Sequence, residues 1–277
     1  MARAGNIVNK SEADAGITLS GTVEAGASVT VSGFETADKA ATVASDGTWS
    51  LTVSTADLKA DAANELTAVQ TDDAGNVSSA ASFTVTTDFS VDTPVITAVS
   101  SDNIVGASEI AGSATVTLSG TGEAGAAVTV TGGAATKTDT VNSDGSWSVD
   151  LSSADLNADA TTDFSVTQTD LVGNVSTAAT VTVTTDLQAP AAPAINDVST
   201  DNLVNAFENS GGFNLTGTGE ADATVTVSGF VTGAKTATVG SGGTWSVAVA
   251  EGDLAPNADT ALSATQADVA GNTSVAM

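Results

Sequence analysis

Two short stretches, Ala114-Thr-Val-Thr-Leu-Ser119 and Ala127-Val-Thr-Val-Thr131, decide the fold of this chain. In both, apolar and hydroxyl residues alternate with a period of two, as in a strand buried on one face. Gly122-Glu-Ala-Gly125 separates them, and its glycines suit the left-handed backbone of a tight turn. The stretches therefore predict two half-buried β-strands joined by a turn.

Similar runs on both sides complete a unit of seven expected strands. The five additional runs are Val95 to Val99, Thr138 to Val141, Trp147 to Leu151, Phe164 to Thr169 and Ala179 to Thr184. An Asp-Gly turn at Asp144 is a strong hairpin signal, and β-branched residues dominate the runs. Because no segment keeps a helical period, the sequence predicts an all-β chain whose unit is a seven-stranded Greek-key β-sandwich.

The unit recurs. Trp49, Trp147 and Trp245 are spaced by 98 positions, and a Gly-Asn pair ending at residues 76, 174 and 272 has the same spacing. This period fits one sandwich of about 100 residues rather than a solenoid repeat. The expected repeats are 1–91, 92–189 and 190–277. We expect the first repeat to lack its first strand and the third to lack its last, which leaves open sheet edges.

The composition restricts the function. The chain has 33 acidic and 6 basic residues, a formal charge of −27, and no cysteine or histidine. Such a charge argues against nucleic acid and anionic membranes as partners, and favours cations. Without cysteine or histidine, thiol chemistry, disulfides and the commonest catalytic bases are excluded, so we expect no enzyme. Each tryptophan is expected to be a core anchor.

Three motifs of the middle repeat carry a family resemblance. They are Leu118-Ser-Gly-Thr-Gly-Glu123, Ser143-Asp-Gly-Ser-Trp-Ser148 and Gln168-Thr-Asp-Leu-Val-Gly-Asn-Val-Ser176, and all three recur in the other repeats. In this respect the whole chain resembles the bacterial immunoglobulin-like repeats of giant biofilm-associated and other nonfimbrial adhesins. The resemblance implies an extracellular spacer of such an adhesin, used in biofilm formation or surface attachment. It also implies calcium, often bound at the junctions between repeats.

In a sandwich with this strand order, the loop between the second and third strands and the last hairpin loop lie where the chain enters. We therefore expect acidic residues of these loops and of the linkers to bind Ca²⁺, whose ligands are six to eight oxygens. The candidates are Asp88, Asp92, Glu123 and Asp170 at the first junction, Asp186, Glu220 and Asp268 at the second, and Glu24 and Asp72 in the first repeat. Because no linker precedes Glu24 and Asp72, the site in the first repeat is expected to be incomplete.

A second acidic set is expected at the opposite pole of the middle repeat. It comprises Asp102, Asn103, Glu109, Asp144, Asp155 and Asp159. These residues suit either intradomain metal sites or turns, because Asp and Asn stabilise turns without any metal. The third repeat has Gly242 where the others have Asp46 and Asp144, so a role for that carboxylate is not common to all repeats.

A different class of function stays open. Threonine-rich runs such as Thr182-Val-Thr-Thr185 suit a flat surface that binds a glycan, matrix or ice, although threonine is also a good strand former. The expected partners are therefore the neighbouring repeats of a monomeric rod and a cell-surface or matrix ligand. Neither a signal peptide at Met1 nor an apolar run long enough to span a membrane is found, and any export signal is expected outside this segment.

Overall fold

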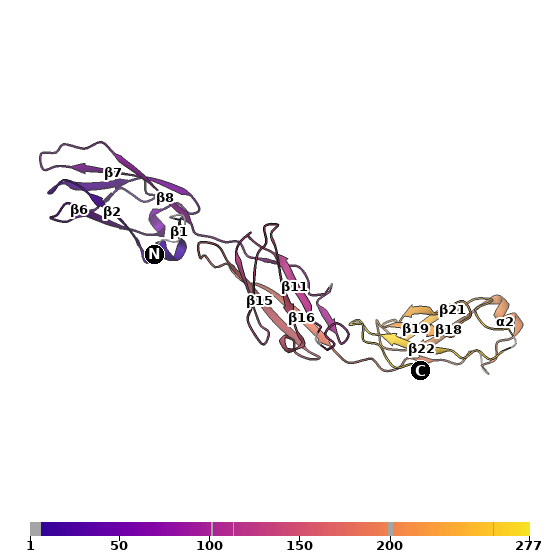
Figure 1. The fold of residues 1–277 in the computed structure, drawn as a ribbon. Coiled ribbons are helices and arrows are strands. Elements are labelled where there is room, and N and C mark those ends of the chain that lie inside the picture. The colour runs from indigo at the N-terminus through magenta and orange to yellow at the C-terminus, as the bar shows by residue number, and fades with distance from the viewer. Residues whose placement is uncertain (1–6, 101, 113, 199–201, 257) are drawn as a thin grey trace.

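The computed structural model describes residues 7–100, 102–112, 114–198, 202–256 and 258–277. In it the chain forms three β-sandwiches that follow one another along its length (Figure 1). Alternating burial along the strands places valine and leucine inside and threonine and serine outside, as the sequence pattern predicts. The all-β class and the three-sandwich array are confirmed.

The middle sandwich shows the complete arrangement. One sheet has the order β10-β16-β15-β12-β13, and the other has the order β14-β11-β9. The bounds are β9 Val95–Ile96, β10 Ile104–Gly106, β11 Val116–Thr121, β12 Ala127–Thr131, β13 Lys137–Thr140, β14 Ser146–Leu151, β15 Thr161–Thr169 and β16 Ala179–Asp186. The chain therefore changes sheet before and after β10, again between β11 and β12, and before and after β14, as in a Greek-key sandwich.

One strand was not expected. β10 pairs in parallel with β16, in a segment for which the sequence indicates only a loop. Three residues are too few to show a period of two, and the partner strand is far away in sequence. The first sandwich repeats this feature, because β1 (Ile7–Asn9) pairs in parallel with β8.

Among the residues described, each outer sandwich departs from the strand arrangement of the middle one. The other strands of the first sandwich are β2 Ile17–Thr22, β3 Ser28–Ser32, β4 Lys39–Ala40, β5 Thr42–Val43, β6 Thr48–Val53, β7 Ala63–Thr71 and β8 Ala81–Asp88. Those of the third are β17 Ala194–Ile195, β18 Phe213–Thr218, β19 Thr224–Ser228, β20 Lys235–Thr238, β21 Thr244–Val249 and β22 Ser263–Ala267. Within the described chain, no counterpart of β9 flanks β2, and no counterpart of β16 flanks β22. Among the described residues, β2 and β22 therefore each lie at the edge of a sheet.

In the part of the chain that the structure describes, helical structure is limited to segments of six residues or fewer. α1 (Lys10–Ala15) and α2 (Ala206–Gly211) begin at asparagine capping boxes, and the 3₁₀ turns are η1 (Thr55–Asp57) and η2 (Ser153–Asp155). β8 ends at Asp88 and β9 begins at Val95, so the repeat boundary expected at residue 92 falls in the connecting segment. The exact repeat boundaries remain predictions.

Each core is built around its tryptophan. Trp49, Trp147 and Trp245 are only 8%, 1% and 3% exposed and pack among valines and leucines. A glycine on the adjacent strand makes room for the ring, since a Cβ at Gly120 would lie 2.6 Å from Trp147 and 1.9 Å from the Val95 carbonyl oxygen. The expectation that the tryptophans are core anchors is confirmed.

Lysine is scarce in this chain, and three of its five lysines make the same contact. Lys39, Lys137 and Lys235 are spaced by 98 positions and bind a buried aspartate at 2.8, 2.9 and 2.9 Å. The partners are Asp57, Asp155 and Asp253. In the first and last pairs the aspartate pKa is lowered to about 2. Lysine and hydroxyl hydrogen bonds outweigh the burial that would raise the pKa of Asp57. Each pair closes the same turn of its sandwich.

These pairs predict acid sensitivity. A carboxylate whose pKa folding depresses stabilises the native state above its ordinary pKa of about 4, and that contribution is lost as the pH falls toward the folded value. The melting temperature is therefore expected to fall between about pH 4 and pH 2. Calorimetric scans of the wild type and of Asp155→Asn test this. The variant's middle sandwich should melt at a lower temperature at neutral pH and lose less on acidification, and equal acid sensitivity of the two proteins would contradict the assignment.

Candidate functional site at the domain junctions

The last hairpin loop of the middle sandwich is held rigid by one aspartate. Oδ1 of Asp170 accepts backbone N–H groups of Val172, Gly173 and Asn174 at 2.9, 2.6 and 2.9 Å. Its Oδ2 accepts the side-chain amide of Asn174 at 2.6 Å. Gly173 supplies the positive φ of 105° that the turn needs. The loop thereby fixes the amide group of Asn174 in one orientation.

That amide joins the middle sandwich to the first. Oδ1 of Asn174 accepts the backbone N–H of Lys10 at 3.1 Å, and its Nδ2 donates to the carbonyl oxygen of Asp88 at 2.9 Å. Nδ2 of Asn9 donates in return to the Val172 carbonyl at 2.7 Å. Asn174 is only 7% exposed, so these bonds replace water that its polar group has lost. One side chain thus ties together the end of β1 and the end of β8.

The second junction repeats the arrangement. Oδ1 of Asn272 accepts the backbone N–H of Ala107 at 2.8 Å, and its Nδ2 donates to the Asp186 carbonyl at 2.9 Å. The loop approaches the preceding sandwich so closely that a Cβ at Gly106 would lie 2.0 Å from the Ala270 carbonyl oxygen. The sequence shows this asparagine only as a marker of the repeat. The Asp-x-x-Gly-Asn spacing, present three times, was the signal that could have revealed the joint.

A glutamine on the preceding strand holds the other end of each linker. Nε2 of Gln168 donates to the Asp92 carbonyl at 2.7 Å, and Nε2 of Gln266 donates to the Ala191 carbonyl at the same distance. The two glutamines are 0% and 2% exposed. Because these bonds and those of the asparagines end on backbone carbonyls, they fix the linker path without depending on linker side chains.

Carboxylates gather beside the first joint. A groove of about 470 Å³ is lined by Asp61, Asp88, Asp92 and Glu123 together with Ile7, Thr86, Thr87, Ser90 and Val91. The pKa of Asp88 is raised by burial and by the negative charges of Asp170 and Asp61. That of Glu123 is raised by burial and by Asp170, Asp88 and Asp92. The first sandwich, the linker and the middle sandwich therefore all contribute carboxylates to the lining of this groove.

The carboxylates expected at this junction, those of Asp88, Asp92, Glu123 and Asp170, thus lie near one another. Asp61 lies in the same groove, although the sequence did not single it out. Asp61 accepts the backbone N–H of Phe89 at 2.6 Å and the Ser90 hydroxyl at 2.9 Å, and so holds the start of the linker. No group of three or more acidic side chains has the close spacing of a metal site anywhere in the described residues. Their role as Ca²⁺ ligands stays a prediction.

At the second junction, two of the three expected acidic residues contact the same asparagine. Asp186 and Asp268 both contact Asn272, through a backbone carbonyl at 2.9 Å and a carboxylate at 3.0 Å. Glu220 lies in the equivalent turn, where its backbone N–H is bound by Gln266 at 3.0 Å.

The first sandwich has the same loop with no domain docked on it. Both oxygens of Asp72 accept bonds from their own turn, and Asn76 chiefly lowers the pKa of this carboxyl. Asn76 is exposed, whereas Asn174 is buried. Glu24 lies in the neighbouring turn, with its N–H bound by Gln70. These residues form the same loop cluster but make no junction among the described residues.

The expected second acidic set is only partly correct in its location. Asp144 was placed at the exit pole, but the N–H of Gly122 bonds to the carbonyl of Gly145, which places Asp144 beside Glu123 at the entry pole. The hairpin of β13 and β14 points toward the linker, a direction that a hairpin signal alone does not give. Ser146 binds the Asp144 carboxylate and lowers its pKa, as turn chemistry requires.

The rest of the set lies at the exit pole and is also bound by protein groups. Asp155 binds Lys137 and Ser152, and Asp159 accepts the backbone N–H of Leu187 at 2.7 Å. Asn103, Asp102 and Glu109 accept the backbone N–H groups of Val99, Ile104 and Gly106 at 2.8, 3.0 and 2.9 Å. Turn chemistry therefore accounts for these positions.

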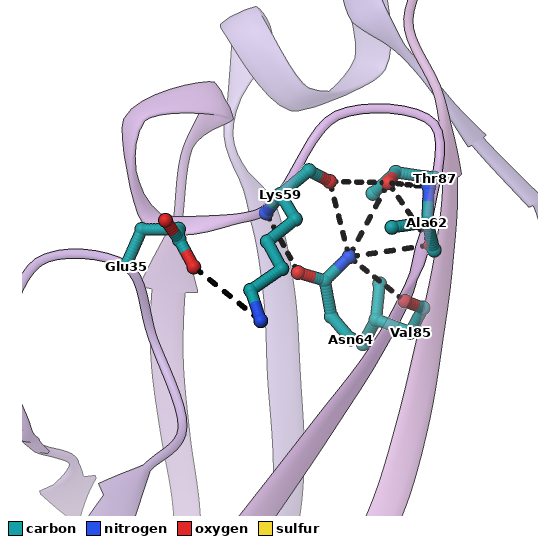
Figure 2. A network of polar contacts seen from close by, with 6 residues as sticks. All are labelled: Glu35, Lys59, Ala62, Asn64, Val85 and Thr87. Atoms are coloured by element: carbon teal, nitrogen blue, oxygen red, sulfur yellow. Dashed lines mark hydrogen bonds and ion pairs between the residues drawn. The ribbon is translucent and has the colours of Figure 1, made fainter.

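A buried network supports the exit pole of the first sandwich (Figure 2). Asn64 accepts the N–H of Lys59 at 2.7 Å and donates to the Val85 carbonyl at 3.2 Å and the Thr87 hydroxyl at 3.3 Å. The network holds the end of β8 next to Asp88. In the middle sandwich Thr162 replaces Asn64, and the buried hydroxyl of Thr185 has no hydrogen-bond partner.

The geometry defines a class of protein: tandem β-sandwich modules joined by side-chain amides. The family model for the bacterial Ig domain, Big_6, matches residues 6–87, 106–185 and 189–277, and the chain belongs to this family. The search of curated proteins finds no match. No helix in the described residues is long and apolar enough to cross a membrane.

Several solved structures to which the chain is similar are adhesin fragments. A fragment of a 1.5-MDa bacterial ice-binding adhesin, studied for host cell surface retention, is 30% identical and has a TM-score of 0.50, over 98% of this chain and 91% of that one. A Ca²⁺-stabilised adhesin with which an Antarctic bacterium binds ice is 34% identical, with a TM-score of 0.49, over 98% and 69%. A single immunoglobulin-like domain of the M. primoryensis ice-binding adhesin is 37% identical, with a TM-score of 0.28, over 35% of this chain and 98% of that one.

Thr162→Asn is expected to stabilise the middle sandwich. The longer side chain should recreate the network of the first sandwich and give the Thr185 hydroxyl a partner, a gain of about 1 kcal/mol in the free energy of unfolding. Denaturant unfolding followed by the signal of Trp147 measures it. The reverse change, Asn64→Thr, should destabilise the first sandwich, and a destabilising Thr162→Asn would show that the middle sandwich cannot adopt this network.

Asn174→Ala is expected to loosen the first junction while leaving each sandwich folded. Asn76→Ala is the matched control, because it removes the same bond within a loop but no contact between domains. With no native cysteine, one cysteine introduced in each of the first two sandwiches carries a spin label at a unique site. The distance distribution should broaden for Asn174→Ala and not for Asn76→Ala. Equal distributions in both variants would exclude the joint.

Proposed function

We propose that the chain is an extracellular spacer segment of a large bacterial adhesin, and that Ca²⁺ stiffens its junctions. The observation that supports this best is the repetition of one joint: at both junctions the same asparagine and glutamine positions hold the linker backbone. Membership of the bacterial Ig domain family and the 30% identical adhesin fragment support the same role. An array built from equivalent joints extends with a regular geometry, as a spacer requires.

Calcium suits the chemistry of the first junction. Asp88, Asp92 and Glu123 offer hard oxygen ligands from the first sandwich, the linker and the middle sandwich. Burial and mutual repulsion raise the pKa of Asp88 and Glu123, so the free carboxylates oppose docking. A divalent cation reverses that interaction. Because these side chains are not preassembled as a cage, the ion would draw them together at about 2.3–2.6 Å and close the groove.

Closing the groove couples metal binding to stiffness. An ion held by two domains and their linker favours the docked arrangement over a swung-out one, and at 100 times its dissociation constant it stabilises that state by about 2.7 kcal/mol. Asp92 is exposed beside the groove and Glu123 lies on the facing turn, so both can move toward an ion without disturbing the core. The unliganded chain is then flexible at this joint, and the bound chain is straighter.

Catalysis has no support in these residues. Without histidine or cysteine the chain lacks the usual base, thiol nucleophile and transition-metal ligands. The family and the similar structures are adhesin immunoglobulin-like domains. An extracellular or cell-surface location follows from the same relatives as part of the proposal.

One surface favours a second candidate, a ligand-binding role. The outer face of the larger sheet of the middle sandwich carries rows of hydroxyls, in which Thr129 lies between Thr138 and Thr167 and Thr184 lies opposite Thr161. Such a face suits a glycan, matrix or ice surface. The row is interrupted at Asp163, whose carboxylate accepts the Thr182 hydroxyl at 2.5 Å, and this charge disfavours a continuous flat array. The spacer is therefore the preferred function.

The calcium proposal is tested by calorimetry and by the spin-label distances, with millimolar Ca²⁺ and with chelator. Calcium should raise the melting temperature and narrow the distance distribution across the first junction. The double variant Asp88→Asn/Glu123→Gln should lose both effects and be more docked without calcium, because repulsion is removed. Asp144→Asn, an exposed carboxylate bound in its own turn, is the control. Asp170 is a poor choice for this test because it also holds the joint loop.

Identical melting curves and distance distributions with and without calcium would exclude a role for the metal at this junction. The spacer role would then depend on the amide joints alone. The spacer role is tested separately, by binding of the chain to glycans, matrix proteins and ice. Saturable binding that is lost when Thr129 and Thr167 are replaced by lysine would favour the ligand-binding role instead.

A further inference from the structure

In the middle and third sandwiches a short linker strand fills a slot beside the tryptophan. β9 pairs with Gly120 and Thr121 of β11, and β17 pairs with Gly217 and Thr218 of β18. The N–H of Thr97 then bonds to the Ser119 carbonyl at 2.9 Å, and that of Asn196 to the Thr216 carbonyl at 2.9 Å. A Pro-(Val/Ala)-Ile sequence with a buried proline and a half-buried isoleucine is common to both segments, at Pro94-Val-Ile96 and Pro193-Ala-Ile195.

The isoleucine and a glutamine complete each filled slot. Ile96 and Ile195 pack against the cores that contain Trp147 and Trp245. From the opposite sheet, Gln168 and Gln266 donate to the linker backbone. Their Oε1 atoms meanwhile accept the N–H groups of Glu123 and Glu220 at 3.0 Å. The slot therefore recognises an extended backbone and one isoleucine side chain.

The first sandwich has the same slot, open. A groove of about 420 Å³ is lined by residues that include Gly21, Thr22, Glu24, Trp49, Ala68 and Gln70. Leu19, Gly21, Ala68 and Gln70 are half-buried here, whereas their counterparts in the other sandwiches are fully buried. Trp49 is 8% exposed, against 1% for Trp147.

The polar groups of the open slot are already in position. Oε1 of Gln70 accepts the N–H of Glu24 at 3.0 Å, as in the filled slots. Among the described residues, its Nε2 has no hydrogen-bond partner. β2 pairs with β6 on one side only, so the Ser20 and Thr22 backbone groups facing the groove are those that the linker strand engages elsewhere. An extended peptide would satisfy the glutamine and the strand edge together.

We propose that this slot is a β-strand acceptor site for an extended Pro-(Val/Ala)-Ile segment of the linker type. The occupant pairs antiparallel with Gly21 and Thr22, accepts the Gln70 amide on a backbone carbonyl two residues before the proline, and inserts its isoleucine beside Trp49. Acidic turns flank the slot, so an occupant without a large negative charge is favoured.

The test uses a peptide with the sequence of residues 91–98 and the whole chain labelled with ¹⁵N. Each sandwich has one tryptophan, so three indole N–H signals report on three slots, of which two are filled. The Trp49 signal should shift saturably as millimolar peptide is added, while those of Trp147 and Trp245 stay in place. Replacing the peptide isoleucine by aspartate should abolish the shift.

The variant Gln70→Glu distinguishes specific recognition of the peptide from nonspecific binding. It keeps the oxygen that accepts the Glu24 N–H and removes the donor, so the peptide should bind about fivefold more weakly in a chain that stays folded. The undisturbed Trp147 signal reports that the rest of the protein is intact. No Trp49 shift at millimolar peptide, equal shifts of all three signals, or equal binding of a scrambled peptide would each overturn the proposal.

Discussion

The array depends on an amide side chain held at the tip of a loop by a carboxylate. An asparagine amide has both a donor and an acceptor, so a single rigid Asn174 can satisfy the N–H of Lys10 and the carbonyl of Asp88 at the same time. Asp170 makes this possible by fixing the loop through three backbone N–H groups. Buried amides of this kind are costly to leave unpaired, which favours the docked state whenever the two domains meet.

Negative charge at the first junction opposes docking of the two domains. Of the few cations in the chain, three lysines each pair with the buried aspartate of one sandwich. The acidic residues at the first junction therefore have no lysine or arginine partner among the described ion pairs, and the raised pKa values of Asp88 and Glu123 record the result. The joint combines a neutral amide contact that favours docking with a carboxylate cluster that opposes it, a balance that a cation can shift.

Sequence reasoning gave most of the fold and less of the site. The alternating runs, the Asp-Gly turns and the period of 98 positions are local signals, and they predicted the sandwiches, the buried tryptophans and the open edges. The convergence of Asp88, Asp92, Glu123 and Asp170 followed from strand order alone. Three features could not be predicted from the sequence: β10, the direction of the Asp144 turn and the partners of Asn174. Each depends on residues remote in sequence. Asparagine in a Gly-Asn turn has an adequate local explanation, which hides its longer-range contact.

The linkers show why this joint tolerates sequence change. Residues 88–92 and 186–191 differ in both sequence and length, yet each segment is held at its start by an asparagine and near its end by a glutamine. Since all four bonds end on main-chain carbonyls, substitutions in a linker leave them intact unless the backbone path itself changes. The first linker connects β8 of one sandwich directly to β9 of the next. A disturbance of its path therefore affects both sandwiches. The linker path is therefore held by the two amides of the receiving domain, and the linker side chains are left to adjust charge at the junction.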